Sequence, residues 1–351
     1  MVSPSVYPII LCGGAGTRLW PESTPRRPKA FLPLTSPRSL LQETALRVAA
    51  IAGAAPAIVV ASHAHTEIVL AEFADVGVAC RLITEPGGRG SAPAIALACL
   101  EIVAEDPDGL AVAVACDHHV PDPEAFAAGV LAALPAAAKG AIATFGVRPT
   151  QVSTAYGYIE PGELLEGPVR RAARFIEKPD LDRAEELLAA GCLWNSGNFV
   201  FHAGVMLAEL EAREPALMAA ALRAHAELRR EGQVLALGDA FLASPDIAID
   251  VAVMERTDRA AVLPIDYAWS DLGAWDAVFE AADKDADGNA TRGRVSIVDS
   301  QGCLVRTDSV TRVAIIGLKD VAVIVENGRV LVCDLASAQK VRLASKGLET
   351  A

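Results

Sequence analysis

A glycine-rich turn near the start of the chain carries the clearest chemical potential. Three glycines and a threonine build it: Gly13, Gly14, Gly16 and Thr17. Glycine lets a backbone approach a polyphosphate closely, and the exposed N–H groups of such a turn attract anions. The turn follows the apolar run Tyr7–Cys12, and two cations accompany it, Arg18 at once and Lys29 eleven residues later. This spacing suits a bound triphosphate and a pyrophosphate leaving group.

The turn differs from two well-known phosphate-binding motifs. Leu19 occupies the position at which a dinucleotide-binding turn needs its third glycine. A Walker A loop is excluded as well, because no Gly-Lys-Ser/Thr triplet follows.

Two aspartates are candidate ligands for a divalent cation. Asp117 follows the apolar run Leu110–Ala115, and Asp271 lies in a Trp-Ser-Asp-Leu-Gly segment. Mg²⁺ prefers one or two carboxylates together with phosphate oxygens and water. On pattern alone, however, a single aspartate in a turn is more often a cap or a solvent-exposed residue. The run Asp283–Asn289 begins like a calcium loop but has Arg294 at its twelfth position, so we interpret it as a linker.

The elements that position these residues can be predicted from the hydrophobic pattern of the first 150 residues. The predicted strands are Tyr7–Cys12, Pro56–Ala61, Ala79–Thr84, Leu110–Ala115 and Ala141–Val147. Helices are predicted between them over residues 39–52, 65–75, 91–105 and 123–138. This alternation is typical of βαβ units with a mostly parallel sheet, whose ligands collect at the carboxyl ends of the strands. The glycine turn and Asp117 both lie at such ends.

Beyond residue 150 the pattern changes twice. Residues 151–282 are less regular, with helices predicted near 181–190 and 205–231. After the linker, short β-branched runs separated by turns predict a small all-β domain with a helical or frayed tail. We therefore divide the chain into domains at 1–283 and 284–351.

Composition limits the possible partners. The chain has 351 residues, is 52% hydrophobic and carries a net charge of −13, which disfavours binding to nucleic acid. The seven cysteines are scattered without a CxxC pair, as expected of reduced thiols in a cytoplasmic protein. The first residues lack the basic region of a secretory signal, and we expect no membrane partner.

The order of the motifs resembles that of the sugar-1-phosphate nucleotidylyltransferases, and within them the mannose-1-phosphate guanylyltransferases. The matching segments are Gly13–Pro21, Pro28-Lys29, Phe31–Leu34, Glu85-Pro86, Gly88-Arg89, Ala92–Ala96, Asp117-His118, Tyr156–Ile159, Phe175–Pro179, Trp194–Gly197, Ile249-Asp250, Val253–Glu255 and Trp269–Trp275. They cover roughly residues 7 to 280 in the family's order. Gly90, where such enzymes usually have Asn, and Cys116, where they usually have Ala, depart from the pattern.

The resemblance implies a fold, a reaction and a set of site residues. The fold would be a Rossmann-like, GT-A-like nucleotidyltransferase domain with a small, β-helix-like C-terminal domain. The reaction would join GTP and mannose 1-phosphate, with Mg²⁺ as cofactor, to give GDP-mannose and diphosphate. The implied roles are catalysis by Arg18 and Lys29; nucleotide binding by Gly13, Gly14, Gly16, Thr17, Glu85 and Ala92; sugar-phosphate binding by Gly157, Glu177, Lys178 and Asn195; and metal binding by Asp117 and Asp271.

Two alternatives remain open at this point. The acceptor could be another hexose or heptose 1-phosphate, or the chain could be a non-catalytic regulatory subunit that binds nucleotide sugars. Retention of Arg18, Lys29 and both aspartates favours an enzyme. We expect a homodimer, although nothing in the sequence sets the oligomeric state.

Overall fold

The computed structural model describes residues 5–14 and 16–349. The chain forms two compact units that interleave along the sequence. The first comprises the residues up to Gly13 together with Thr44–Cys116 and Val120–Trp269. The second comprises Gly14–Glu43, Asp117–His119 and the residues from Ser270 onward.

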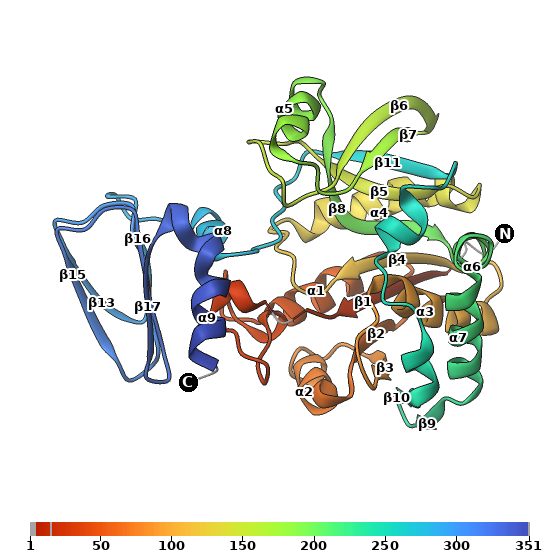
Figure 1. Ribbon diagram of the computed structural model, residues 1–351. Helices are drawn as coiled ribbons and strands as arrows, with labels where there is room; N and C mark the ends of the chain where they lie inside the picture. Colours follow the sequence, from red (N-terminus) through yellow and green to blue (C-terminus); the bar gives the residue numbers. More distant parts are fainter. Residues whose placement is uncertain (1–4, 15, 350–351) are drawn as a thin grey trace. The chain divides into compact units, whose positions relative to one another are not determined.

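An eleven-stranded sheet forms the centre of the first unit (Figure 1). Its strands, in spatial order, are β5 (Ile142–Val147), β11 (Ala260–Ile265), β7 (Val169–Ile176), β6 (Tyr158–Glu166), β8 (Leu193–His202), β4 (Leu110–Ala115), β1 (Val6–Cys12), β2 (Ala57–Ser62), β3 (Cys80–Glu85), β10 (Val234–Ala236) and β9 (Arg229–Glu231). The run from β4 to β10 is parallel, and β8 joins β4 in the antiparallel direction. The predicted Rossmann-like α/β fold is confirmed.

Helices cover both faces of this sheet. They are α1 (Leu40–Ala49), α2 (Thr66–Asp75), α3 (Ser91–Glu105), α4 (Pro123–Ala138), α5 (Leu181–Ala189), α6 (Ala203–Arg213) and α7 (Pro215–Ala226). On one face α3, α6 and α7 lie side by side and share a core with alternate residues of β1 and β4, such as Tyr7 and Ala111 (Figure 1). On the other face Phe126 of α4 meets Phe145 of β5 edge-to-face at 5.6 Å. Strands covered on both faces must be apolar throughout, which explains their unbroken hydrophobic runs.

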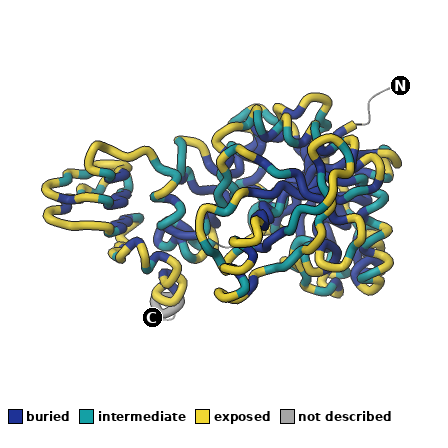
Figure 2. The backbone as a smooth tube through the Cα atoms, turned by 90° about the horizontal axis from the view of Figure 1, so that it is seen from above, coloured by how far each residue is buried: buried dark blue, intermediate teal, exposed yellow. Residues whose placement is uncertain are grey.

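Burial follows this layering. Buried residues run through the interior of the sheet, whereas exposed residues mark the turns and the outer faces of the helices (Figure 2). No helix within residues 5–14 and 16–349 is long and apolar enough to cross a membrane.

The prediction of one helix near 205–231 is wrong. The segment forms two helices, α6 and α7, and then the short edge strand β9. Pro215 separates the helices, because proline has no N–H to donate and fits only in the first turn of a helix. The pattern of apolar residues continues through this break, so it did not reveal the change of direction.

Two small sheets form the C-terminal part of the second unit. One contains β12 (Ala290–Arg292), β14 (Leu304–Thr307), β16 (Val321–Glu326) and β17 (Arg329–Asp334); the other contains β13 (Arg294–Val298) and β15 (Arg312–Ile316). The pairs are parallel except for the final hairpin of β16 and β17. Strands β12 to β16 alternate between the two sheets, so the chain winds as a β-helix, with β13 and β15 along one wall (Figure 1). The helices α8 (Trp275–Ala281) and α9 (Val341–Glu349) flank it in sequence, and the predicted β-helix-like domain is confirmed.

The N-terminal segment contributes to the main core of the second unit. Leu19, Leu32 and Leu40 pack in one cluster with Trp275 of α8 and Ile324 of β16. Arg306, only 4% exposed, pairs with Glu22 through two contacts of 2.7 and 3.0 Å. The segment after the glycine turn is thus held by the C-terminal strands.

Candidate active site

The glycine turn follows β1 and adopts a backbone that side chains disfavour. Gly14 and Gly16 have φ of +90° and +60°. A Cβ at Gly16 would lie 2.4 Å from the Cβ of Lys29, so no larger residue fits there. Gly13, Gly14 and Thr17 are exposed. The turn therefore presents open backbone to a ligand while its second half packs against the segment that carries Lys29.

Lys29 is the centre of the charged cluster that follows. Its side chain is buried, and Nζ lies 3.0 Å from Oδ2 of Asp117. The same ammonium donates to the backbone oxygen of Asp271, a residue 242 positions away in the sequence. An antiparallel bridge between His119 and Ser270, with N–O distances of 2.9 and 3.0 Å, aligns the two aspartate segments. Segments remote in the chain thus converge on one lysine.

The electrostatics of this cluster favour an ionised carboxylate. Burial alone would raise the pKa of Asp117, but the Lys29 ammonium and His118 outweigh it, and the pKa is lowered. Among the described residues, no three His, Cys, Asp or Glu side chains form a metal-binding group. Mg²⁺ takes one or two carboxylates and completes its shell with phosphate oxygens and water, so the carboxylates of Asp117 and Asp271 are donors of the kind that fits this metal.

Asp271 belongs to a strained turn. The next residue, Leu272, is fully buried and has φ of +42°, a region that leucine rarely occupies. Oδ1 of Asp271 accepts a hydrogen bond from Gly273 N at 3.2 Å, and Oγ of Ser270 accepts one from Leu272 N at 3.1 Å. Backbone strain of this kind persists where the surrounding structure over-determines it, often at functional sites. Here it holds the Asp271 carboxylate in one orientation.

Arg18 points to a different partner. It lies in the short 3-10 helix Thr17–Leu19, and its Nη1 donates to Oε1 of Gln339 at 2.8 Å. Gln339 in turn donates to the carboxylate of Asp276 at 3.1 Å. Because arginine has five N–H donors and this contact uses one, the guanidinium can also bind an anionic ligand.

The predicted sugar-phosphate residues form a second group, in the first unit. Gly157 lies so close to Glu177 that a Cβ would be 2.5 Å from Oε2, and its oxygen accepts from Asn195 N at 2.8 Å. Lys178 forms an ion pair with Glu177 and has φ of +43°, outside the range preferred by lysine. Gly157, Glu177, Lys178 and Asn195 thus converge from the ends of β6 and β7 and from β8.

One acidic residue that the sequence analysis did not assign to the site belongs to this group. Asp250 Oδ1 accepts from Asn195 Nδ2 at 2.8 Å, and Asn195 Oδ1 accepts from Gly197 N at 3.0 Å and from Thr144 Oγ1 at 2.8 Å. Burial, followed by the charge of Glu177, raises the pKa of Asp250 to about 6. Asp250 begins a single π-helical turn, a feature frequent at functional sites. The motif Ile249-Asp250 was the available signal.

Glu85 and Ala92 frame the segment predicted to bind the base. Glu85 ends β3, burial raises its pKa to about 7, and Oε1 has no hydrogen-bond partner among the described residues. Ala92 is buried in the first turn of α3, where its N–H already donates to Ile247 O at 3.1 Å. A Cβ at Gly90 would lie 2.4 Å from the same oxygen, which explains the glycine at this position.

The tryptophans contribute to packing. Tyr156 meets Trp194 at 4.8 Å and Trp269 at 5.5 Å between ring centroids. Trp275 is fully buried and donates from Nε1 to Trp20 O at 2.9 Å.

Comparison with known proteins agrees with this arrangement. Residues 7–288 match the family described as nucleotidyl transferase, and residues 293–346 match the MannoseP isomerase/GMP-like beta-helix domain. The xanthan biosynthesis protein XanB of Xanthomonas campestris is 40% identical over 96% of this chain and 72% of its own. The mannose-1-phosphate guanylyltransferase of Escherichia coli is 36% identical over 97% and 73%.

A solved structure is similar to this chain over nearly its whole length. A crystal structure from Thermus thermophilus, described as mannose-1-phosphate geranyltransferase, superposes with a TM-score of 0.87 and 32% identity over 98% of this chain and 99% of its own. The two family matches together run from residue 7 in β1 to residue 346, after the β-helix strands. The chain belongs to the nucleotidyl transferase family.

Proposed function

We propose that the protein is a mannose-1-phosphate guanylyltransferase, which forms GDP-mannose and diphosphate from GTP and mannose 1-phosphate. The observation that carries the proposal is the cluster of Lys29, Asp117 and Asp271, built from three separate segments beside the glycine turn. Relatives that carry this name are 36% identical or more over nearly the whole chain.

The proposed step is a single in-line displacement. A phosphate oxygen of mannose 1-phosphate forms a bond to the α-phosphorus of GTP, the bond from that phosphorus to the bridging oxygen breaks, and diphosphate leaves with the electron pair. The attacking phosphate is already anionic, so neither a protein nucleophile nor a strong base is needed. Catalysis then consists of positioning and charge stabilisation.

Each group of site residues has its own role in this step. The backbone of Gly13, Gly14 and Gly16 with Thr17 cradles the triphosphate, and Arg18 and Lys29 stabilise the charge that develops on the leaving group. In the second group, Lys178 binds the sugar phosphate, while Glu177 and Asn195 bind hydroxyl groups. Glu85 reads guanine through N1–H and N2–H, and Ala92 packs beside the base.

Asp117 and Asp271 are the residues that would hold Mg²⁺. When bound, the metal would neutralise phosphate oxygens as charge redistributes. Without a cation, two carboxylates facing a triphosphate would add repulsion to an already acidic protein. Lys29 offsets part of this repulsion, because its ammonium pairs with the Asp117 carboxylate and donates to the backbone oxygen of Asp271.

The test is diphosphate release from each nucleoside triphosphate paired with each sugar 1-phosphate, in Mg²⁺ and in EDTA. We expect turnover with GTP and mannose 1-phosphate that stops in EDTA. Preference for another hexose or a heptose 1-phosphate would revise the acceptor. Binding of GDP-mannose without any turnover would support a regulatory subunit instead. The expected homodimer is tested separately by light scattering.

A further inference from the structure

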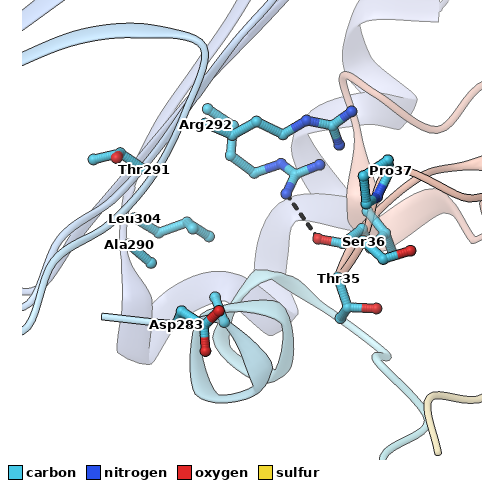
Figure 3. A pocket seen from close by; sticks show the side chains of 11 residues that line it. Thr35, Ser36, Pro37, Asp283, Ala290, Thr291, Arg292 and Leu304 are labelled. Atoms are coloured by element: carbon cyan, nitrogen blue, oxygen red, sulfur yellow. Dashed lines mark hydrogen bonds between the residues drawn. The ribbon is translucent and has the colours of Figure 1, made fainter. Parts of the chain in front are cut away.

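A cavity of about 360 Å³ lies in the second unit, and its lining residues do not include Lys29, Asp117 or Asp271. Figure 3 shows it from close by. Its walls come from the loop Leu34–Pro37, from Ala282 and Asp283 just after α8, and from strands β12 and β14. Thr35, Ser36 and Arg292 line one part, and Asp283 lines another (Figure 3). Its volume lies at the lower end of the range for small-molecule sites, roughly 300–1,000 Å³.

Two arginines, Arg292 and Arg306, line the cavity together with one carboxylate, Asp283. Arg292 and Arg306 both donate to one acceptor, the backbone oxygen of Pro33. Two guanidinium groups therefore lie close together, yet only Arg306 has a carboxylate, Glu22. Within the part of the chain that the structure describes, no carboxylate lies at ion-pair distance from Arg292. Burial, followed by the charge of Arg306, lowers the pKa of Arg292, although the nearby charges of Glu22 and Glu326 act in the opposite direction.

The remaining donors of Arg292 suit a phosphoryl group. Among the described residues, one of its five side-chain N–H groups has a partner, and arginine binds phosphate in a bidentate manner. The hydroxyl of Thr291 lies on the same strand, and Thr291 lines the same cavity. An anion here would give the Arg292 guanidinium a charged partner, as Glu22 does for Arg306.

The rest of the cavity lining is acidic or apolar, unlike the part that contains Arg292. Asp283 contributes a carboxylate, which accepts hydrogen bonds from hydroxyl groups and repels a second anion. Apolar side chains, among them Leu304 and Pro37, complete the walls (Figure 3). The complementary ligand is short, anionic at one end and hydroxylated at the other.

We propose that this cavity binds a sugar phosphate, with the phosphoryl group on Arg292 and a hydroxyl group on Asp283. The site is distinct from the one that holds the predicted sugar-phosphate residues Glu177 and Lys178. It is also linked to the catalytic cluster, since Thr35 lines the cavity and its hydroxyl contacts His119 Nδ1 at 3.2 Å, two residues from Asp117. The assignment does not depend on the proposed function.

The test is isothermal titration calorimetry on the full chain with glucose 6-phosphate, and separately with inorganic phosphate. Glucose 6-phosphate is chosen because it is not the acceptor of the proposed reaction. We expect saturable binding that Arg292→Ala weakens at least tenfold. The matched control is Arg294→Ala, an exposed arginine two residues away that does not line the cavity, and it should change the affinity less than twofold.

Two further variants separate the possible outcomes. Asp283→Asn should weaken glucose 6-phosphate but leave inorganic phosphate unchanged, and Lys178→Ala should retain both. Equal affinity for phosphate and glucose 6-phosphate would overturn the assignment of a sugar. Binding that is lost in Lys178→Ala but kept in Arg292→Ala would place the probe in the active site and overturn the proposal. A wild-type protein that binds neither probe would also overturn it. Unchanged melting temperatures confirm that the variants fold.

Discussion

Glu85 has a pKa of about 7 because it is buried, and one of its oxygens has no hydrogen-bond partner among the described residues. If the carboxylate accepts guanine N1–H and N2–H, GTP binds the ionised form. The folded pKa is raised, so at pH 6 most of the protein carries the neutral acid and at pH 8 the carboxylate. We predict that GTP affinity increases about tenfold from pH 6 to pH 8.

Binding titrations over this range check the prediction, with Glu85→Gln as the control. Because glutamine does not ionise, this variant should bind GTP more weakly and without the same pH dependence. An identical pH profile in both proteins would assign the dependence to GTP itself or to another group, and would show that Glu85 does not read the base.

Asp250 should orient Asn195 for the sugar. Its carboxylate accepts from Asn195 Nδ2, and loss of a hydrogen bond to a charged group costs roughly 1.5–3 kcal/mol. We predict that Asp250→Ala raises the KM for mannose 1-phosphate about tenfold or more and changes the KM for GTP less than twofold. Asp246→Ala, at an exposed position in the loop before the π-helical turn, is the matched control. A parallel rise in both KM values would mean that the variant disturbs the whole fold.

Lys29 should act on the transition state more than on GTP binding, because its ammonium is already committed to the two aspartate segments. We predict that Lys29→Ala lowers kcat at least a hundredfold with little change in the KM for GTP. Steady-state kinetics at saturating Mg²⁺ measure this. A tenfold rise in the KM for GTP with unchanged kcat would mean that Lys29 contributes to GTP binding and not to the chemical step.

At the scale of elements, Glu101 joins helix α3 to helix α7 and strand β9. It is buried, accepts from Arg230 at 2.6 and 2.9 Å, and pairs with His225 at 2.7 Å. Burial opposes ionisation, but the hydrogen bonds from His225 and Arg230 outweigh it and lower the pKa to about 2. The folded pKa is depressed, so this stability is complete above the ordinary value near 4.5 and is lost as pH falls toward 2.

We predict that Glu101→Gln destabilises the protein by about 2–3 kcal/mol at pH 7, and by progressively less below about pH 4.5. Urea unfolding at several pH values measures the difference. The matched control is Glu105→Gln on the same helix, whose exposed pair with Arg81 should contribute less than about 1 kcal/mol. Equal effects of the two variants on the free energy of unfolding would contradict the stabilising role assigned to Glu101.

At the scale of the whole molecule, the β-helix and the segment after the glycine turn share one core. Leu19, Leu32 and Leu40 pack with residues of α8, β14 and β16, and Arg306 holds Glu22. We predict that a chain ending at Ala282 loses most activity and melts at least about 10 °C lower, because these leucines would become exposed. Differential scanning calorimetry and turnover assays check this. Full activity with an unchanged melting temperature would show that the β-helix is dispensable for the rest of the chain.

Much of this protein follows from local sequence. The parallel strands and the helices α1 to α4 lie close to the predicted positions, because a sheet covered on both faces requires apolar runs of a recognisable length. The glycine turn was also predictable, since glycine adopts the positive φ of Gly14 and Gly16 without steric cost. The domain boundary at 283/284 and the roles of the site residues stay predictions.

Only the tertiary structure decided which distant residues meet. The bridge between His119 and Ser270 places both aspartate segments on Lys29, and the packing of β8 against the π-helical turn places Asp250 on Asn195. Such contacts depend on the register and order of strands, which single-sequence periodicity does not encode. The shared core of the β-helix with the glycine-turn segment escaped prediction for the same reason, because it arises from packing between segments that are remote in the chain. The break at Pro215 has a local cause, since proline cannot donate a backbone N–H inside a helix, but the apolar pattern continues through it.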